Sequence, residues 1–292
     1  MRNLHLSDLH LGATEPERPG VGESETPFDG YERRAWAGRG RAYADSFAKL
    51  CAGAVPQLLD AAGVGAGDRV LDVGTGPGTV AAAAVARAAL VTAVDAEPSM
   101  VELAREAVPQ AAVRLGTLPE LPCADQEFDA VVGNFVLNHV GRPAAALTEL
   151  RRVVRPGGRI ALTIWAVPAA AGQTLLWRAV EAAGVTRPAH LPPLDAEHDF
   201  PRTPAGLVAL LESAGWREPE CVELRWEHRA GRQEWWDGAA AGIGFIGQLL
   251  LAQEESVREL VRGHYLELSR EFADADGTLL LPHAALLVSG RR

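Results

Sequence analysis

A glycine-rich turn between an apolar run and a helix is the strongest chemical signal in this sequence of 292 residues. Residues 70–79 are Val-Leu-Asp-Val-Gly-Thr-Gly-Pro-Gly-Thr, so that Gly74, Gly76 and Gly78 alternate and Asp72 lies two residues before them. Glycine lets the backbone pass close to a ligand, and the first turn of a helix offers free N–H groups. In open α/β sheets, ligands bind where a strand ends in such a turn. The sequence therefore predicts a ligand site here.

A second carboxylate, Asp95, follows the next apolar run, residues 90–94. In dinucleotide-binding folds an acidic residue at the end of the second strand accepts hydrogen bonds from ribose hydroxyls. The nicotinamide-dinucleotide fingerprint needs glycine at the sixth position of the turn, where this chain has Thr79. The two signals together predict a ribose-containing ligand but argue against a nicotinamide dinucleotide.

This acidic-x-Gly-x-Gly-x-Gly string resembles the S-adenosylmethionine-binding loop of class I methyltransferases. Two further segments, Gly116-Thr-Leu-Pro-Glu-Leu-Pro122 and Arg155-Pro-Gly-Gly158, are similar to the small-molecule members related to the ubiquinone and menaquinone methyltransferases. The resemblance covers residues 65–165 and is looser over 203–292 and over the aromatic helix that contains Tyr43. Thr117 stands where that group usually has an aspartate, which leaves the role of this side chain open.

The resemblance implies S-adenosyl-L-methionine as the cofactor and S-adenosyl-L-homocysteine as its product, without a metal. Tyr43 is placed near the methionine end of the cofactor, although an aromatic residue on an amphipathic helix serves equally well in a core. The implied cofactor-binding residues are Tyr43, Asp72, Gly74, Thr75, Gly76, Gly78, Asp95, Ala96, Met100, Gly116, Thr117, Leu118 and Asn134.

A methyl acceptor is expected beside the fourth strand, where the resemblance places the acceptor pocket. His139 is the candidate catalytic residue, because an imidazole can take a proton from a hydroxyl or amine; it can also simply line the pocket. Seven tryptophans favour a small aromatic or hydrophobic acceptor of secondary metabolism, with O-, N- and C-methylation all open. The residues expected to border the acceptor are Phe135, His139, Trp165, Trp235, Trp236 and Phe245, and the alternative for the last three is packing of a lid.

The elements that must position these residues alternate between strands and helices, which predicts a doubly wound α/β fold. We expect a seven-stranded, mostly parallel sheet whose last strand is antiparallel, as the resemblance implies. A polar tail over 1–30 precedes a single domain over 31–292 that begins with a helical segment over 31–62. Insertions near 166–202 and 231–277 are expected to form lids. Strands are located at 69–73, 90–94, 128–133, 159–165, 221–229 and 279–288, and helices at 79–88, 98–106, 144–153, 203–214 and 254–270.

Charge and cysteine content narrow the remaining classes. A net charge of −10 disfavours nucleic acid as a partner. Three cysteines without a CxxC pair fit a reducing cytoplasm, and no apolar run is long enough to span a membrane. Two rival functions remain: a cofactor-binding domain that does not transfer methyl, and a metallophosphoesterase suggested by Ser7-Asp-Leu-His-Leu-Gly12. The second lacks the further metal-binding clusters that a two-metal site needs.

Overall fold

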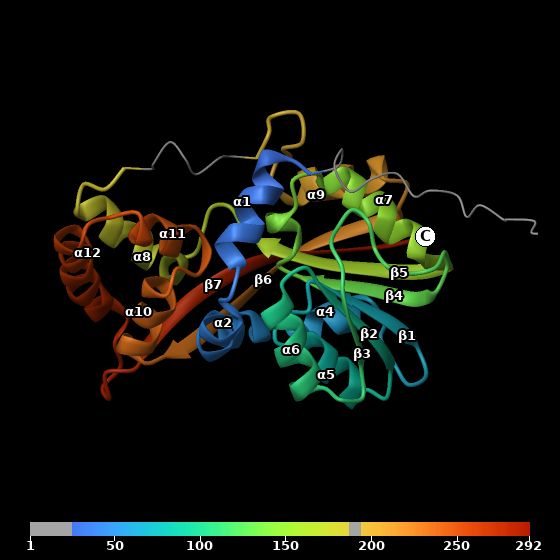
Figure 1. Ribbon diagram of the computed structural model, residues 1–292, viewed down its shortest axis with the longest axis horizontal. Coiled ribbons are helices and arrows are strands. Elements are labelled where there is room, and N and C mark those ends of the chain that lie inside the picture. Colours follow the sequence, from blue (N-terminus) through green and yellow to red (C-terminus); the bar gives the residue numbers. More distant parts are fainter. Residues whose placement is uncertain (1–24, 187–193) are drawn as a thin grey trace, which may run out of the picture.

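A single seven-stranded sheet forms the centre of the computed structural model, which describes residues 25–186 and 194–292 (Figure 1). The strand order is β3-β2-β1-β4-β5-β7-β6. Strands β1 to β5 are parallel, and β7 is antiparallel to both of its neighbours, so that β6 runs parallel to β5. The predicted fold class is therefore confirmed. The strands are β1 Arg69–Val73, β2 Leu90–Asp95, β3 Ala112–Leu115, β4 Phe128–Asn134, β5 Val154–Trp165, β6 Arg217–Ala230 and β7 Leu279–Arg291.

Helices cover both faces of the sheet, which explains why consecutive residues of β1 such as Val70 and Leu71 are both fully buried. One face packs against α4 (Val55–Ala61), α5 (Thr79–Ala86) and α6 (Pro98–Ala107). The other face packs against α7 (Pro143–Val153) and α9 (Pro204–Ser213). The carboxyl ends of the parallel strands, where the glycine-rich turn lies, are thereby held in a rigid frame.

The N-terminal segment differs from the single helical stretch predicted over 31–62. It consists of α1 (Pro27–Trp36), α2 (Gly40–Asp45), α3 (Phe47–Cys51), the 3-10 turn η1 (Ala52–Ala54) and α4. Gly38, with φ +71°, and Ser46, with φ −127° and ψ −100°, interrupt the helix. Helix α1 also begins inside the predicted tail, because Thr26 caps it: the hydroxyl of Thr26 accepts from the Asp29 N–H, and the Asp29 carboxylate accepts from the Thr26 N–H. Residues 1–24 lie outside the described part.

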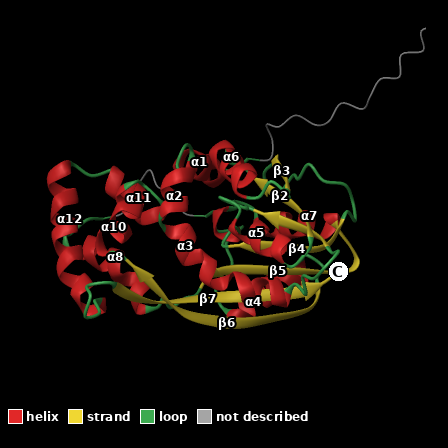
Figure 2. Ribbon diagram, turned by 90° about the horizontal axis from the view of Figure 1, so that it is seen from below, coloured by secondary structure: helices red, strands yellow, loops and turns green. Residues whose placement is uncertain are grey.

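Helices from the two insertions that were expected to form lids pack together in one helical unit. Helix α8 (Ala171–Ala182) packs with α10 (Arg232–Ala240), α11 (Gly244–Leu251) and α12 (Glu255–Leu268), and they share an apolar core. Figures 1 and 2 both show this helical unit at one end of the molecule, with α2 and α3 between it and the cofactor half. The end of the first insertion does not belong to it, because Phe200 packs with Leu207 and Trp216 under α9.

Two details of the sheet were not predicted. Strand β3 is only four residues long, Ala-Val-Arg-Leu, and Arg114 interrupts its apolar residues, so the sequence has no continuous apolar run here. The Arg155–Gly158 turn is part of β5: the pairing with β4 shifts from Phe128 with Val154 to Ala130 with Arg159, so the extra residues form a bulge. The bulge lies at the start of β5, away from the carboxyl edge, whereas the end of β3 leads into Gly116 beside Asp95.

Candidate active site

The glycine-rich turn joins β1 to α5, and its three glycines have φ values of +65°, +56° and +91°. A side chain at Gly74 would collide with Val136, and one at Gly78 would press on Val108 and Ala104. At Gly76 a Cβ atom would meet only the Tyr43 ring, at 3.4 Å. Gly74 and Gly78 are therefore required by packing, whereas the position of Gly76 faces the Tyr43 ring.

Asp72 lies directly under this turn and is completely buried. Its Oδ2 accepts a hydrogen bond of 2.6 Å from the Thr75 hydroxyl, while its buried Oδ1 has no partner. Burial raises the pKa of Asp72 to about 7, and the nearby charge of Asp95 contributes in the same direction. An unpaired buried carboxylate oxygen is costly unless a donor or a cation meets it. The orphaned oxygen thus fits a cofactor that carries an amino group.

Asp95 ends β2 beside the turn, and its carboxylate is already oriented by the backbone. Its Oδ2 accepts from the Gly76 N–H at 2.8 Å, and its Oδ1 accepts from the Glu97 N–H at 3.0 Å. Burial raises the pKa of Asp95, and these N–H donors offset only part of that rise. Each carboxylate oxygen retains a further lone pair, so Asp95 fits the predicted contact with ribose hydroxyls.

The expected adenine side is assembled from the segments that follow β2 and β3. Met100 is buried on α6, and Ala96 is exposed at the start of the loop before it. The Gly116 N–H donates to the Asp95 carbonyl at 3.0 Å, which brings the two loops together. The Thr117 hydroxyl donates to the carbonyl of Leu118 in its own loop, so its side chain is turned to the loop and not committed to any other group.

Asn134 ends β4, and Phe135 follows it with an unusual backbone conformation. The Asn134 amide donates to the Cys51 carbonyl at 3.0 Å and accepts from the Thr163 hydroxyl at 2.6 Å, so it ties the N-terminal helices to β4 and β5. Phe135 has φ +60°, a region that bulky residues rarely adopt, and its N–H is held by the Thr163 hydroxyl. This strained backbone directs the Phe135 ring across the sheet onto Trp165.

Six rings form what we call the aromatic cluster: Phe135, Trp165, Trp226, His228, Trp235 and His283. Phe135 stacks on Trp165 with ring centres 4.0 Å apart at 23°, and Trp165 stacks on Trp226 at 6.1 Å. His283 lies 6.0 Å from both tryptophan rings, and Trp235 lies 5.6 Å from His283. Burial lowers the pKa of His283 to about 4, so the ring is neutral. Within the cluster Phe135, Trp165 and Trp226 are stacked, and the other rings meet them at larger angles.

The aromatic cluster contains three residues that the sequence analysis missed. Trp226 and His283 are register partners in the pairing of β6 with β7, and His228 is two residues further on the same face of β6. The available signal was alternation: residues 224–229 are Leu-Arg-Trp-Glu-His-Arg, so each second residue is uncharged or aromatic and its neighbours are charged. The order of the strands, which places this face beside Trp165, is not written in that alternation.

Two of the predicted acceptor-site residues lie elsewhere. Trp236 packs against Tyr265 at 5.4 Å, inside the core of the helical unit. Phe245 is 38% exposed and contacts Trp177 at 6.3 Å. Trp236 therefore packs inside the helical unit, Phe245 lies at its surface, and Trp235 reaches the aromatic cluster and Phe47. A role of these residues at the acceptor stays a prediction.

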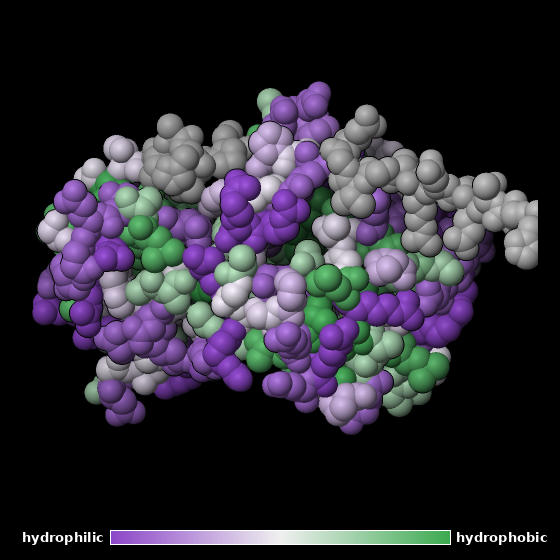
Figure 3. All heavy atoms as spheres, in the orientation of Figure 1, coloured by the Kyte–Doolittle hydropathy of each residue, from purple (hydrophilic) through white to green (hydrophobic). Residues whose placement is uncertain are grey.

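His139 lies in the 3-10 turn η2 (Leu137–His139) after β4, and its side chain is 36% accessible. Its Nδ1 is 2.8 Å from the Glu32 carboxylate of α1, and its ring meets the Trp36 ring edge-on at 5.3 Å. Burial alone would lower the pKa of His139, but the charge and hydrogen bond of Glu32 and the charge of Asp95 outweigh it and leave the pKa raised. Hydrophobic surface shows in a recess beside α1 (Figure 3).

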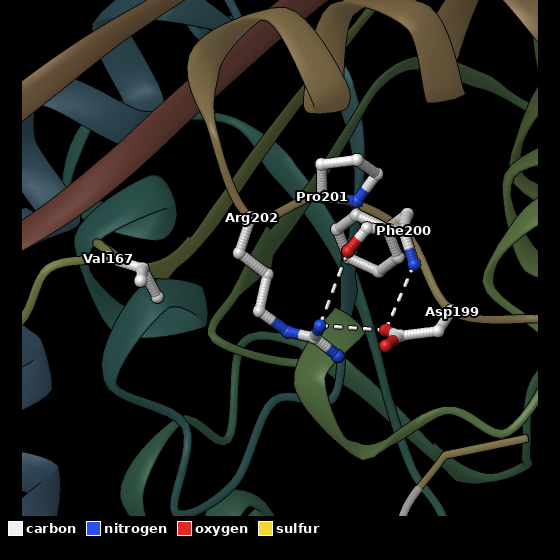
Figure 4. Close-up of a pocket in the computed structure, with 5 residues that line it drawn as sticks. All are labelled: Val167, Asp199, Phe200, Pro201 and Arg202. Atoms are coloured by element: carbon white, nitrogen blue, oxygen red, sulfur yellow. Dashed lines mark hydrogen bonds and ion pairs between the residues drawn. The ribbon is translucent and has the colours of Figure 1, made fainter. Parts of the chain in front are cut away.

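A separate surface hollow of about 500 Å³ lies against Val167, Asp199, Phe200, Pro201 and Arg202 (Figure 4). The Arg202 guanidinium bonds to the Asp199 carboxylate at 2.7 Å and lies over the Phe200 ring. Its charge is thus already paired, and none of the predicted site residues borders it. The hollow is not part of the candidate site.

Comparison with known proteins agrees with this geometry. A family model described as a methyltransferase domain matches residues 71–162. A demethylmenaquinone methyltransferase of Beutenbergia cavernae is 34% identical over 168 residues, which cover 54% of this chain and 70% of the relative. The chain belongs to the class I S-adenosylmethionine-dependent methyltransferases. The cofactor of this family is S-adenosyl-L-methionine.

Two further similarities extend the family relationship. An uncharacterised protein of transposon TN4556 from Streptomyces fradiae is 42% identical over 111 residues, and the match spans only about a third (32%) of that protein's length. The crystal structure of Haemonchus contortus phosphoethanolamine N-methyltransferase 2, in complex with phosphomonomethylethanolamine and S-adenosylhomocysteine, has a TM-score of 0.51. Its sequence identity is 17%, and the superposition covers 82% of this chain and 52% of that one, so this likeness concerns the fold.

The observed fold is that of a methyltransferase, and the described residues give no support to the phosphoesterase alternative. Residues 7–12, which suggested it, lie outside the described residues. Among residues 25–186 and 194–292, no group of three His, Cys, Asp or Glu side chains is arranged to hold a metal ion. In the same part of the methyltransferase, no helix is both long and apolar enough to cross a membrane.

Proposed function

We propose that this methyltransferase transfers the methyl group of S-adenosyl-L-methionine to a small, flat aromatic acceptor at an oxygen, nitrogen or ring carbon. The aromatic cluster carries the proposal. Tyr43, which faces Gly76 of the cofactor loop, belongs to the same apolar cluster as Phe135, Trp165 and Trp226. A planar molecule stacked there would reach the end of the cofactor loop.

The chemistry at such a site needs little more than alignment. The bound cofactor supplies an electrophilic methyl group on a sulfonium sulfur. Holding an acceptor atom in line with that carbon, at about 3–3.5 Å, accounts for much of the acceleration of such a reaction. The stacked rings of Phe135 and Trp165 would orient the acceptor plane, and the buried Trp235 would exclude water from one end.

The family relationship supports a planar acceptor. The Beutenbergia cavernae relative and one from Mycobacterium, 32% identical over 181 residues, are both named demethylmenaquinone methyltransferases. Their names specify a quinone-type acceptor for those proteins. For this chain we propose the broader class of aromatic hydroxyl and amino compounds, without nucleic acid as a substrate, because the net charge of −10 would repel it.

His139 is proposed as the base for an acceptor that carries a proton. Only the neutral imidazole can accept that proton, so the rate should rise with pH as His139 deprotonates. Because Glu32 raises the pKa of His139, the midpoint of this rise should lie above 6.5. Replacing His139 by alanine should lower turnover about 10²–10⁴-fold if it is the base. A flat pH profile with an active alanine variant would make His139 a pocket-lining residue.

The experiment combines cofactor binding with a search for product. Calorimetry with S-adenosylhomocysteine tests the cofactor site, and incubation with labelled S-adenosylmethionine and a panel of naphthols, hydroquinones, catechols and arylamines tests transfer. We expect S-adenosylhomocysteine to accumulate only when an aromatic acceptor is present, and each labelled product to be identified by mass. Cofactor binding without transfer to any compound of the panel would favour the domain that binds cofactor but does not methylate.

A further inference from the structure

We infer that Glu32 is a positioning residue for His139: it holds the imidazole with its proton on Nδ1 and leaves Nε2 free to accept the proton of the methyl acceptor. Helix α1 is then part of the active site and not only a cover. The proton-accepting role rests on the proposed function, whereas the positioning of the ring by Glu32 stands on its own contacts.

The pair is built from one carboxylate oxygen and two donors. The Glu32 Oε2 atom lies 2.8 Å from His139 Nδ1 and accepts a hydrogen bond of 3.1 Å from the Trp36 indole N–H. The Glu32 side chain is only 16% exposed, so water competes weakly for this oxygen. Trp36 follows Glu32 by one helical turn, and its ring lies edge-on to both His139 and Tyr43 at 5.3 Å. The imidazole is therefore fixed by a hydrogen bond on one side and a ring on another.

A second contact holds α1 against the same loop. Asp29, three residues before Glu32 on the same face of the helix, accepts a hydrogen bond of 2.6 Å from the Gly141 N–H. The other Asp29 oxygen accepts from the Thr26 N–H and hydroxyl, which closes the N-terminal cap of α1. The contacts of Asp29 and Glu32 thus register α1 to residues 139–141, and only the contact of Glu32 touches the imidazole.

The chemical consequence follows from what a carboxylate can do. An ionised carboxylate only accepts hydrogen bonds, so the His139 nitrogen facing Glu32 must carry the proton. In the neutral ring the other nitrogen, Nε2, is then free of a proton. When an acceptor O–H or N–H bond breaks, its proton forms a bond to Nε2 and the acceptor atom keeps the electron pair. The resulting imidazolium is stabilised by the charges of Glu32 and Asp95. Tyr43 reaches this space through Trp36, and the Asp29 carboxylate faces the same loop at Gly141.

The test reads the ring directly by nitrogen-15 NMR of labelled histidine, with the His139 signal identified by its loss in His139→Asn. In the wild-type protein we expect a pKa above 6.5 and, above that pH, the Nδ1–H tautomer. In Glu32→Gln we expect the pKa to fall by about one unit, a tenfold loss of proton affinity, and the tautomer preference to weaken. Binding of S-adenosylhomocysteine should be unchanged in this variant, because none of the Glu32 contacts involves the cofactor loop.

Two matched variants separate the effect of Glu32 on the His139 ring from the attachment of α1 to residues 139–141. Asp29→Asn loosens α1 without touching the ring, so the pKa and tautomer of His139 should stay as in the wild type. Glu32→Asp keeps the charge and should restore part of the pKa shift, which covers the case in which Glu32→Gln does not fold. An Nε2–H tautomer in the wild type, or the same change in Asp29→Asn as in Glu32→Gln, would overturn the inference.

The pH profile of the methyl-transfer rate tests whether the Glu32–His139 pair acts in the reaction. With any phenol that the panel identifies, the lower midpoint of the rate should move to lower pH in Glu32→Gln by the same amount as the pKa of His139. If the NMR shift occurs and the midpoint stays in place, His139 is not the group that accepts the proton, and the part of the inference that assigns Nε2 this role is wrong. If no compound is methylated although the NMR result is as expected, the proposed function fails and the Glu32–His139 pair stands.

Discussion

The cofactor loop takes its residues from one short stretch of chain, whereas the aromatic cluster joins residues as far apart as Phe135 and His283. In the loop, Asp72 to Gly78 follow one another, and we expect their backbone to contribute most of the contacts to the cofactor. In the aromatic cluster, the side chains come from the end of β4, from β5, β6 and β7, and from α10. Substitutions in the loop should therefore act first on ligand affinity, with stability changes that come from backbone strain or buried charge, and those in the cluster should act through lost packing on affinity and stability together.

The largest expected effect belongs to the loop. Gly76→Val should abolish binding of S-adenosylhomocysteine, because Gly76 has φ +56° and its Cβ would enter the space beside Tyr43. Gly67→Val is the matched control: it has φ +81° and open space around its Cβ. Both variants carry the backbone strain of about 1–2 kcal/mol, so their melting temperatures should fall alike. Normal binding calorimetry for Gly76→Val would remove the cofactor site from this loop.

The next effect contrasts the helical unit with the aromatic cluster. Trp236→Ala should lower the free energy of unfolding by about 3–5 kcal/mol, because it empties a buried site beside Tyr265. Trp165→Ala should cost less stability, since Trp165 is only partly buried, but it should raise the KM for an aromatic acceptor. Chemical denaturation and kinetics with one acceptor compare the two. An unchanged KM in Trp165→Ala would place the acceptor away from the cluster.

The sequence predicts the cofactor half well because its signals are local. The turn at 74–78, the apolar runs of β1, β2 and β4 and the acidic residue after β2 each lie within a few neighbouring positions. The predicted fold class, cofactor and family are confirmed on that basis. Strand β3 was not predicted, because its four residues, Ala-Val-Arg-Leu, do not form a continuous apolar run.

The acceptor half was harder to predict because its contacts are long-range. Glu32 meets His139 across 107 positions of the chain, and nothing near Glu32 in the sequence indicates a catalytic partner. Trp236 and Phe245 look like Trp235 in the sequence, yet only Trp235 points to the sheet. Which side of α10 faces the aromatic cluster depends on how α10 packs against α3, where Phe47 meets Trp235 at 4.9 Å. Helical periodicity alone does not determine that choice.

A smaller effect is expected on the free energy of unfolding, because the buried carboxylate of Asp72 destabilises the folded protein when it is ionised. The pKa of Asp72 is about 7 in the folded protein, well above its ordinary value near 4. Because folding favours the protonated carboxyl, the apo protein should lose stability as pH rises from about 4 to about 7, by roughly 2–4 kcal/mol. Asp72→Asn should remove this dependence and melt higher than wild type at about pH 8, but bind S-adenosylhomocysteine more weakly. Thermal unfolding of both proteins at a series of pH values measures this dependence. The same dependence of melting temperature on pH in the wild type and in Asp72→Asn would contradict the prediction.

The smallest effect is expected at the N-terminus, just before helix α1, which carries Glu32. The composition of residues 12–24 is poor in apolar side chains, so removing residues 1–24 should change the free energy of unfolding by less than about 0.5 kcal/mol. Removing residues 1–30 should act differently, because it takes away the Thr26 cap and the Asp29 bond to Gly141.

A cap of this kind contributes about 1 kcal/mol, and without Asp29 the helix that carries Glu32 is held to residues 139–141 by one contact fewer. The longer deletion should therefore lower the melting temperature and broaden the His139 NMR signal, while affinity for S-adenosylhomocysteine changes little in either protein. If removal of residues 1–24 already destabilises the protein as much as removal of residues 1–30, then residues before 25 contribute to the folded structure and the prediction is wrong. If neither deletion affects His139, the docking of α1 does not depend on its first turn, and Glu32 and Trp36 alone fix the helix against the loop.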